Sequence, residues 1–191
     1  MTTSPASDLP AAPRIAPVEP PFAPALADQL AAIMPAGVPP LRLFTTLARS
    51  PRVFQRFLAG ALLDRGALSL RQRELMIDRT CARLGNAYEW GVHVTWFGAR
   101  IGLDDAQRDA LARGPWDAPV FAPAEQAILR LADELYAGAR ISDAAWALVR
   151  AHFDDDQALE LIALAGFYRT VAYYCCGLAL PLEPIGAPLP T

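Results

Sequence analysis

Signals for the start and the end of α-helices recur along nearly the whole chain after residue 24, and they restrict the fold more than any other feature. Serine, asparagine or aspartate stands where a helix would be capped, glycine follows where it would stop, and prolines separate the shorter apolar runs. No stretch has the strict alternation and the β-branched enrichment that mark a strand. The sequence therefore predicts an all-α fold, a single compact helical domain.

The expected helices follow from this punctuation. Ser69 and Gln72 form a capping box, and Gly85 and Gly102 can adopt the left-handed conformation that ends a helix. We expect helices at residues 25–33, 41–48, 52–63, 69–84 and 86–101, then one capped by Asp104 and Gln107, one from Pro123 to about Tyr136, and two that start at Ser142 and Asp154.

Length and charge limit the organisation and the partners. With 191 residues, 53% of them hydrophobic, the chain has material for one domain. We expect a flexible Pro/Ala-rich arm at residues 1–24, a helical domain at 25–184 and a C-terminal tail at 185–191. The arm lacks the basic start and apolar core of a secretory signal. A net charge of -3 without a Lys/Arg cluster argues against a nucleic-acid partner.

The most apolar stretch, residues 158–180, is interrupted by charged side chains, so we expect a buried core helix and no membrane partner. Arg169 within it could meet a substrate carboxylate, pair with a buried acid or face a subunit interface. Cys81, Cys175 and Cys176 have neither metal-ligand nor redox spacing, and buried thiols usually behave as small hydrophobes. This cysteine usage fits a reducing cytoplasm.

Glu74 is the first candidate for chemistry. On the helix at 69–84, one face carries a stripe with spacings of 4, 3, 4 and 3, made of Leu70, Glu74, Ile77, Cys81 and Leu84. A carboxylate in an apolar row is a candidate proton carrier, because burial raises a carboxyl pKa. The alternative is a buried ion pair with Arg79 or another arginine.

A second polar line lies on the helix at 86–101, which is apolar around most of its circumference and is therefore expected to lie centrally. Glu89, His93 and Arg100 follow one another on one face. A carboxylate one turn from a histidine can fix its tautomer and raise its basicity, so Glu89 and His93 are a plausible acid–base pair. Alternatively, Glu89 only completes a capping box with Asn86, and His93 is a satisfied core residue.

A metal centre is not expected. Glu89 and His93 could supply two ligands, but a zinc site normally needs at least three, and the second histidine, His152, belongs to a distant helix.

The run Arg73-Glu74-Leu75, followed by Asn86-Ala87-Tyr88-Glu89-Trp90-Gly91-Val92-His93, resembles the carboxymuconolactone decarboxylase and alkylhydroperoxidase D-like superfamily. The likeness extends from about Pro40 to Leu182. The peroxidase branch carries Glu, eleven residues, Cys, two residues, Cys, three residues, His. Here Asn86 and Glu89 occupy both cysteine positions, so the resemblance argues against thiol peroxidase chemistry.

The resemblance implies a homo-oligomeric, all-α enzyme of aromatic compound catabolism that removes carbon dioxide from 4-carboxymuconolactone without a metal or organic cofactor. In that reaction His93 would be the acid, Glu89 would hold and polarise it, and Glu74 would shuttle the proton or disfavour the leaving carboxylate. The substrate-binding candidates are Tyr88 and Trp90 as walls of a dry pocket, Asn86, and Arg79 or Arg100 as the anchor of a substrate carboxylate.

Three other functions fit the same residues. One is an isomerase or lyase acting on another small conjugated carbonyl compound, with the same three residues in the same roles. Another is a redox enzyme that uses Cys81. The third is a non-catalytic oligomeric binding protein in which the polar row is only an internal network.

Overall fold

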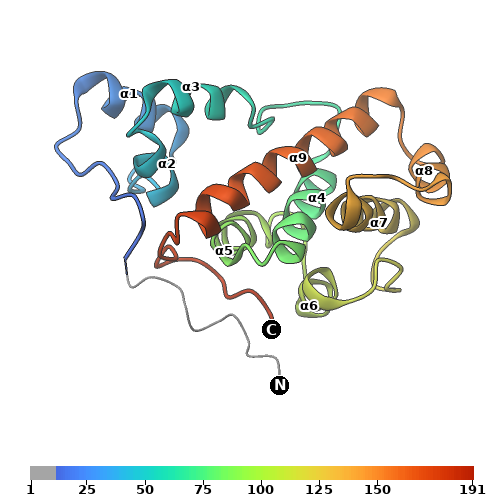
Figure 1. Cartoon of the computed structure of the whole chain (residues 1–191). Coiled ribbons are helices and arrows are strands. Elements are labelled where there is room, and N and C mark those ends of the chain that lie inside the picture. The colour runs from blue at the N-terminus through green and yellow to red at the C-terminus, as the bar shows by residue number, and fades with distance from the viewer. Residues whose placement is uncertain (1–11) are drawn as a thin grey trace.

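The computed structural model describes residues 12–191, and over these residues it contains nine α-helices and no strand (Figure 1). The all-α prediction is confirmed. The helices are α1 (Pro24–Ile33), α2 (Arg42–Leu47), α3 (Pro51–Ala59), α4 (Leu70–Arg83), α5 (Ala87–Phe97), α6 (Asp105–Arg113), α7 (Pro123–Gly138), α8 (Asp143–Arg150) and α9 (Asp155–Gly177).

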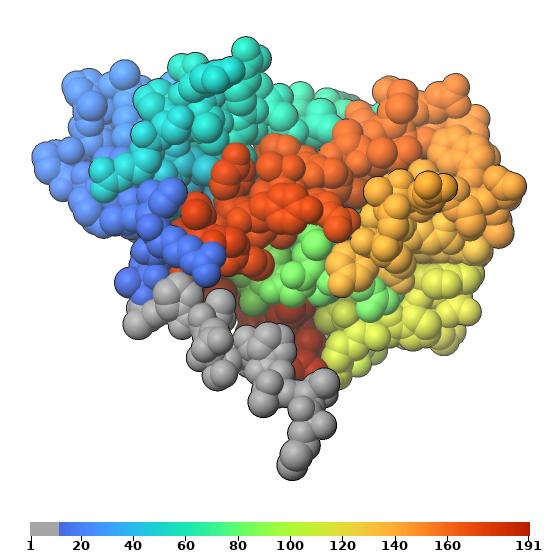
Figure 2. All heavy atoms as spheres, viewed as in Figure 1, coloured from blue at the N-terminus to red at the C-terminus, as the bar shows by residue number. Residues whose placement is uncertain are grey.

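Helix α4 is the centre of the domain. Eight consecutive residues, Glu74–Cys81, are buried, and α4 packs against α5, α6, α7 and α9. We expected the helix at 86–101 to hold this place. Helix α5 is also buried from Tyr88 to Val94, but part of its surface is covered by the C-terminal tail and not by another helix. Figure 2 shows α9 crossing one face of the molecule, between the N-terminal helices and α7.

Side-chain caps fix where the helices begin. Ser69 and Gln72 form the predicted capping box, and Asn86 accepts a hydrogen bond from the backbone of Glu89. Gly85, with φ of 65°, makes the tight connection between α4 and α5. Because this connection is short, the two helices that carry the candidate catalytic residues are neighbours in space.

Two helices are shorter than the prediction. The helix expected at 52–63 ends at Ala59, because Gly60 caps it and Leu62 has a left-handed backbone with φ of 47°. The helix expected at 86–101 ends at Phe97, and the chain then closes in a turn through Gly102, the predicted stop.

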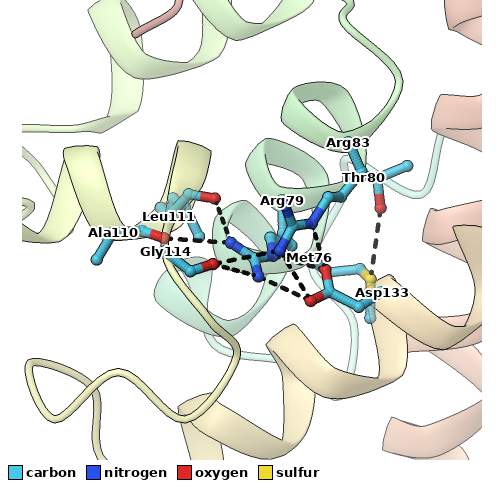
Figure 3. Close-up of polar contacts among 8 residues, drawn as sticks. All are labelled: Met76, Arg79, Thr80, Arg83, Ala110, Leu111, Gly114 and Asp133. Atoms are coloured by element: carbon cyan, nitrogen blue, oxygen red, sulfur yellow. Dashed lines mark hydrogen bonds and ion pairs between the residues drawn. The ribbon is translucent and has the colours of Figure 1, made fainter. Parts of the chain in front are cut away.

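A buried arginine joins three helices (Figure 3). The Arg79 side chain is fully buried, and its Nε and Nη2 donate to the two carboxylate oxygens of Asp133 on α7, both at 2.7 Å. Its remaining donors reach the carbonyl oxygens of Ala110, Leu111 and Gly114 at the end of α6. All five N–H groups are thus used for structure, which offsets the cost of burying the charge.

Both ends of the described chain lie against the helices. The backbone N–H of Arg14, in the expected arm, donates to the carbonyl of Leu178 at the end of α9, and residues 1–11 of the arm lie outside the described residues. The tail is fastened to α5, because Ala187 donates to the carbonyl of Gly91 and Trp90 Nε1 donates to the carbonyl of Pro188. None of the helices described is long and apolar enough to span a membrane.

Candidate functional site

The structure brings His93, Glu74 and Glu89 together. His93 Nδ1 lies 2.7 Å from Glu74 Oε2, across the α4–α5 contact, and His93 Nε2 lies 3.5 Å from Glu89 Oε2. The exposed fractions are 4% for His93, 0% for Glu74 and 5% for Glu89, so all three ionisable groups sit in a water-poor environment. The imidazole is therefore held on both sides by carboxylates.

A fourth residue, Tyr168 of α9, belongs to this cluster and was missed by the sequence analysis. Its hydroxyl lies 2.9 Å from His93 Nε2, and the two rings meet edge to face. It is 75 positions from His93 in the chain, so no local spacing could reveal the contact. The one available signal was a tyrosine inside a very apolar helix, because a buried tyrosine hydroxyl usually has a partner.

His93 carries a positive charge at neutral pH. Burial alone lowers the pKa of His93, but the charge and the hydrogen bond of Glu74, together with Glu89, outweigh burial and raise that pKa to about 10. Both ring nitrogens then carry protons. Nδ1–H donates to Glu74, and Nε2–H donates toward Tyr168 and Glu89.

Glu74 is anchored from behind by Arg73. Arg73 Nε donates to Glu74 Oε1 at 3.0 Å, and its Nη1 donates to the carbonyl of Leu63 in the connection between α3 and α4. The ion-pair partner of Glu74 is thus Arg73, whereas Arg79 is bound to Asp133. Arg73 thus fixes the position of the Glu74 carboxylate and connects this carboxylate to the loop that contains Leu63.

Asp78, one turn after Glu74 on α4, is buried beside the cluster. Its Oδ1 has no hydrogen-bond partner among the described residues, and burial raises the pKa of Asp78 well above its usual value against the lowering effect of His93. The ligand atoms of Glu74, Asp78 and His93 lie within 4.8 Å of one another, and they form the one set in the described part of the chain that could hold a metal ion.

A cavity of about 650 Å³ opens on one side of His93. Helix α5 contributes Glu89, Val92, His93, Trp96 and Phe97, which are the residues on one helical face. The remaining walls come from the end of α1, from α2, α3 and the loop after it, and from α9, through Ile33, Pro35, Leu41, Leu43, Phe44, Phe57, Leu58, Ala59, Ala61, Leu62, Leu63, Asp64, Phe167, Tyr168 and Val171. The cavity is mostly apolar, with its polar groups gathered around His93 and at Asp64.

The five expected substrate-binding residues are placed elsewhere. The Tyr88 hydroxyl bonds Glu183 and the backbone of Leu43, and Trp90 lies under the C-terminal tail. Asn86 caps α5, and its buried Nδ2 has no partner among the described residues. The two arginines expected to anchor a substrate carboxylate are also engaged elsewhere or exposed. Arg79 is in the buried ion pair with Asp133, and Arg100 is exposed beyond the end of α5.

Burial and contacts also place the cysteines and Arg169. Cys81 is fully buried, and burial raises the pKa of its thiol well above the usual value. Cys175 Sγ lies 3.9 Å from Glu89 Oε1, and burial raises its pKa as well. Both thiols are therefore protonated and poor nucleophiles. Arg169 donates to the carbonyls of Leu135 and Tyr136 at the end of α7.

Several solved structures share this fold at low sequence identity. A protein of unknown function from Agrobacterium tumefaciens is 22% identical, with a TM-score of 0.63 over 71% of this chain and 94% of that one. A peroxidase-related protein from Silicibacter sp. TM1040 is 16% identical, with a TM-score of 0.73 over 93% and 95%. The debrominase Bmp8 is 13% identical, with a TM-score of 0.70 over 90% and 92%. These likenesses define the class of the fold, an alkylhydroperoxidase D-like helical domain.

Residues 48–134 match the model of the Carboxymuconolactone decarboxylase family, and a comparison with curated protein sequences finds no match. This segment is similar to that family, and the fold of the described chain is of the alkylhydroperoxidase D-like type. The matched segment contains Glu74, Glu89 and His93, whereas Tyr168 lies outside it.

Proposed function

We propose that the chain is a small-molecule carboxy-lyase that decarboxylates a conjugated carboxylic acid by acid–base chemistry of its own side chains. The observation that carries the proposal is His93, a buried imidazole with a pKa raised to about 10, on the wall of an apolar cavity. A histidinium in a dry site can bind a carboxylate and stabilise negative charge that develops during a reaction. It can also deliver a proton.

The reaction needs one proton and no oxidant. When the bond to the carboxylate breaks, carbon dioxide leaves, and the electron pair passes through the conjugated system to the carbonyl oxygen. The Tyr168 hydroxyl and the positive charge of His93, both at the cavity wall, can stabilise that oxygen. His93 then delivers a proton to a carbon of the conjugated system, where a new C–H bond forms, and a proton from solvent restores the histidinium. Glu74 keeps the imidazole oriented throughout and favours its charged form before and after the proton transfer.

The charges that line the cavity restrict the acid. Among the described residues His93 is the one cationic side chain of the lining, and Asp64 and Glu89 are its carboxylates. A substrate with a single carboxylate next to His93 suits this balance better than 4-carboxymuconolactone, which carries two, because a second carboxylate would be buried without a counter-charge.

Carbon dioxide release from purified protein tests the proposal. Two compounds are compared, 4-carboxymuconolactone and the corresponding butenolide acid without the acetate arm, and we expect faster release from the second. The change His93→Gln should abolish release, whereas His152→Gln, which alters an exposed histidine, should not. Absence of release from both compounds, or equal release by the His93→Gln variant, would reject the proposal.

We also propose, on the family likeness, that the chain acts as a homo-oligomer in the cytoplasm on compounds from aromatic catabolism. Light scattering coupled to size-exclusion chromatography measures the assembly, and a monomer at micromolar concentration would contradict that part.

A further inference from the structure

The two carboxylates beside His93 are not equivalent. Glu74 is wholly buried, makes short contacts with His93 and Arg73, and is not part of the cavity lining. Glu89 lines the cavity, and within the described structure its carboxylate makes two longer side-chain contacts, at 3.5 Å to His93 Nε2 and at 3.9 Å to the Cys175 thiol. Glu89 is therefore a loosely held base that faces any bound molecule.

Tyr168 is the matching acid. Because His93 is protonated, its Nε2–H donates to the oxygen of Tyr168, and this leaves the tyrosine's own proton for another acceptor. Burial, followed by the charges of Glu89 and Glu74, raises the pKa of Tyr168 well above the usual value, so that proton stays on the hydroxyl. Tyr168 also lines the cavity, where the natural acceptor is an oxygen of the bound molecule.

From this geometry we propose that Glu89 and Tyr168 form an enolising pair that moves a proton within an uncharged β,γ-unsaturated carbonyl compound and so converts it to the conjugated isomer. The proposal rests on the proposed function in using the same cavity and the same charged His93. It differs in that the bond broken is a C–H bond and that the group acting on carbon is Glu89.

The steps balance without a co-reactant. Glu89 takes a proton from the carbon next to the carbonyl group, and the C–H electron pair moves onto the carbonyl oxygen, which accepts a hydrogen bond from Tyr168. Glu89 then returns the proton to the carbon at the far end of the conjugated system, and the double bond shifts. His93, bonded to Tyr168, stabilises the enolate through the hydroxyl that it polarises.

The cavity favours an uncharged ligand for this reaction. Its lining is dominated by aliphatic and aromatic side chains. Its carboxylates, Asp64 and Glu89, would repel an anionic group that lies anywhere in the cavity other than beside His93. The volume of about 650 Å³ accommodates a ring compound with an apolar body. The chemical class is therefore a neutral cyclic enone.

The test uses cyclohex-3-enone as the probe. Its conversion to cyclohex-2-enone, and the uptake of deuterium from D2O next to the carbonyl group, are followed by NMR with the full chain. We expect Glu89→Gln to slow exchange by about 100-fold or more, as for a lost general base. Tyr168→Phe should slow exchange by about 100-fold, as for a lost oxyanion donor. Glu19→Gln and Tyr136→Phe, at exposed positions, are the matched controls and should exchange at the wild-type rate.

Folding and the two reactions are separated by further measurements. Circular dichroism confirms that each variant is folded, and Glu89→Asp, which keeps the charge but withdraws it by one methylene, should lower kcat for exchange more than it raises KM. Wild-type exchange no faster than in buffer, or full exchange by Glu89→Gln, overturns the enolising pair. Carbon dioxide release that survives either result leaves the proposed carboxy-lyase intact, and its loss alongside normal exchange rejects only the lyase.

Discussion

The change Glu74→Gln removes the charge that keeps His93 protonated while preserving the size of the side chain. Glu74 is the main source of the raised pKa of His93, through its charge and the 2.7 Å contact. Without it, burial is opposed only by Glu89, so the pKa of His93 should fall well below 10. Loss of one partner of a buried ion pair typically costs about 3–5 kcal/mol.

The pH dependence follows from the direction of the shift. A group whose pKa is higher in the folded than in the unfolded chain stabilises the fold below the unfolded value, and that contribution is lost as pH rises through the folded value. With a pKa of about 10 in the folded protein and about 6.5 unfolded, the contribution is about 4 kcal/mol at pH 6.5, about 3 kcal/mol at pH 8 and below about 1 kcal/mol at pH 10. The stability gap between wild type and Glu74→Gln should therefore close as pH rises.

Urea unfolding at these three pH values measures the gap, and NMR titration of the imidazole signals measures the pKa of His93 directly. The chain has two histidines, so the signals are assigned with His152→Gln. Glu19→Gln at an exposed position controls for the loss of one negative charge. A gap that stays constant from pH 6.5 to 10, or a His93 that still titrates near 10 in the Glu74→Gln variant, would refute the reasoning.

The remaining predictions concern the scaffold. Arg79→Lys should lower the free energy of unfolding by about 3 kcal/mol or more in urea, because an ammonium cannot replace the five guanidinium donors. Burial would raise the pKa of Asp133, but Arg79 and Arg83 outweigh burial and lower it. The charged carboxylate therefore stabilises the fold at neutral pH, and this stabilisation is lost as pH falls through the lowered pKa. In Asp133→Asn the free energy of unfolding should accordingly fall less steeply with decreasing pH. Gly91→Ala should cost about 1–3 kcal/mol in thermal melts, because the new Cβ would lie 3.0 Å from the tail backbone. In a chain that lacks residues 183–191, Gly91→Ala should lower the free energy of unfolding much less, because the tail backbone that the Cβ meets is gone.

The local part of the site could be predicted from the sequence. A spacing of four residues places Glu89 and His93 on one helical face, and the short connection at Gly85 brings the helix of Glu74 alongside. The helix starts were equally accessible, because capping side chains act on the backbone a few residues away. These features depend only on neighbours in the chain.

The walls of the cavity could not be obtained in the same way. Tyr88 and Trp90 were expected beside the substrate, but each is one residue from Glu89 and so points about 100° away around the helix. The periodicity itself favours Val92, Trp96 and the other residues of the Glu89 face, and these do line the cavity. The opposite walls come from α1 to α3 and α9, whose approach depends on tertiary packing.

Asn86 and Glu89 occupy the two positions at which the peroxidase pattern has cysteines, and the chemistry of Glu89 differs from that of a thiol in one respect. In the peroxidase pattern a cysteine stands four residues before the histidine, and here Glu89 holds that place. Both groups are acids one helical turn from the imidazole, but a carboxylate forms no disulfide. Cys175 and Cys81 remain nearby as buried, protonated thiols. Both proposed reactions involve proton transfer to carbon without electron transfer, so the Glu89 and Tyr168 variants decide more about this chain than any cysteine variant.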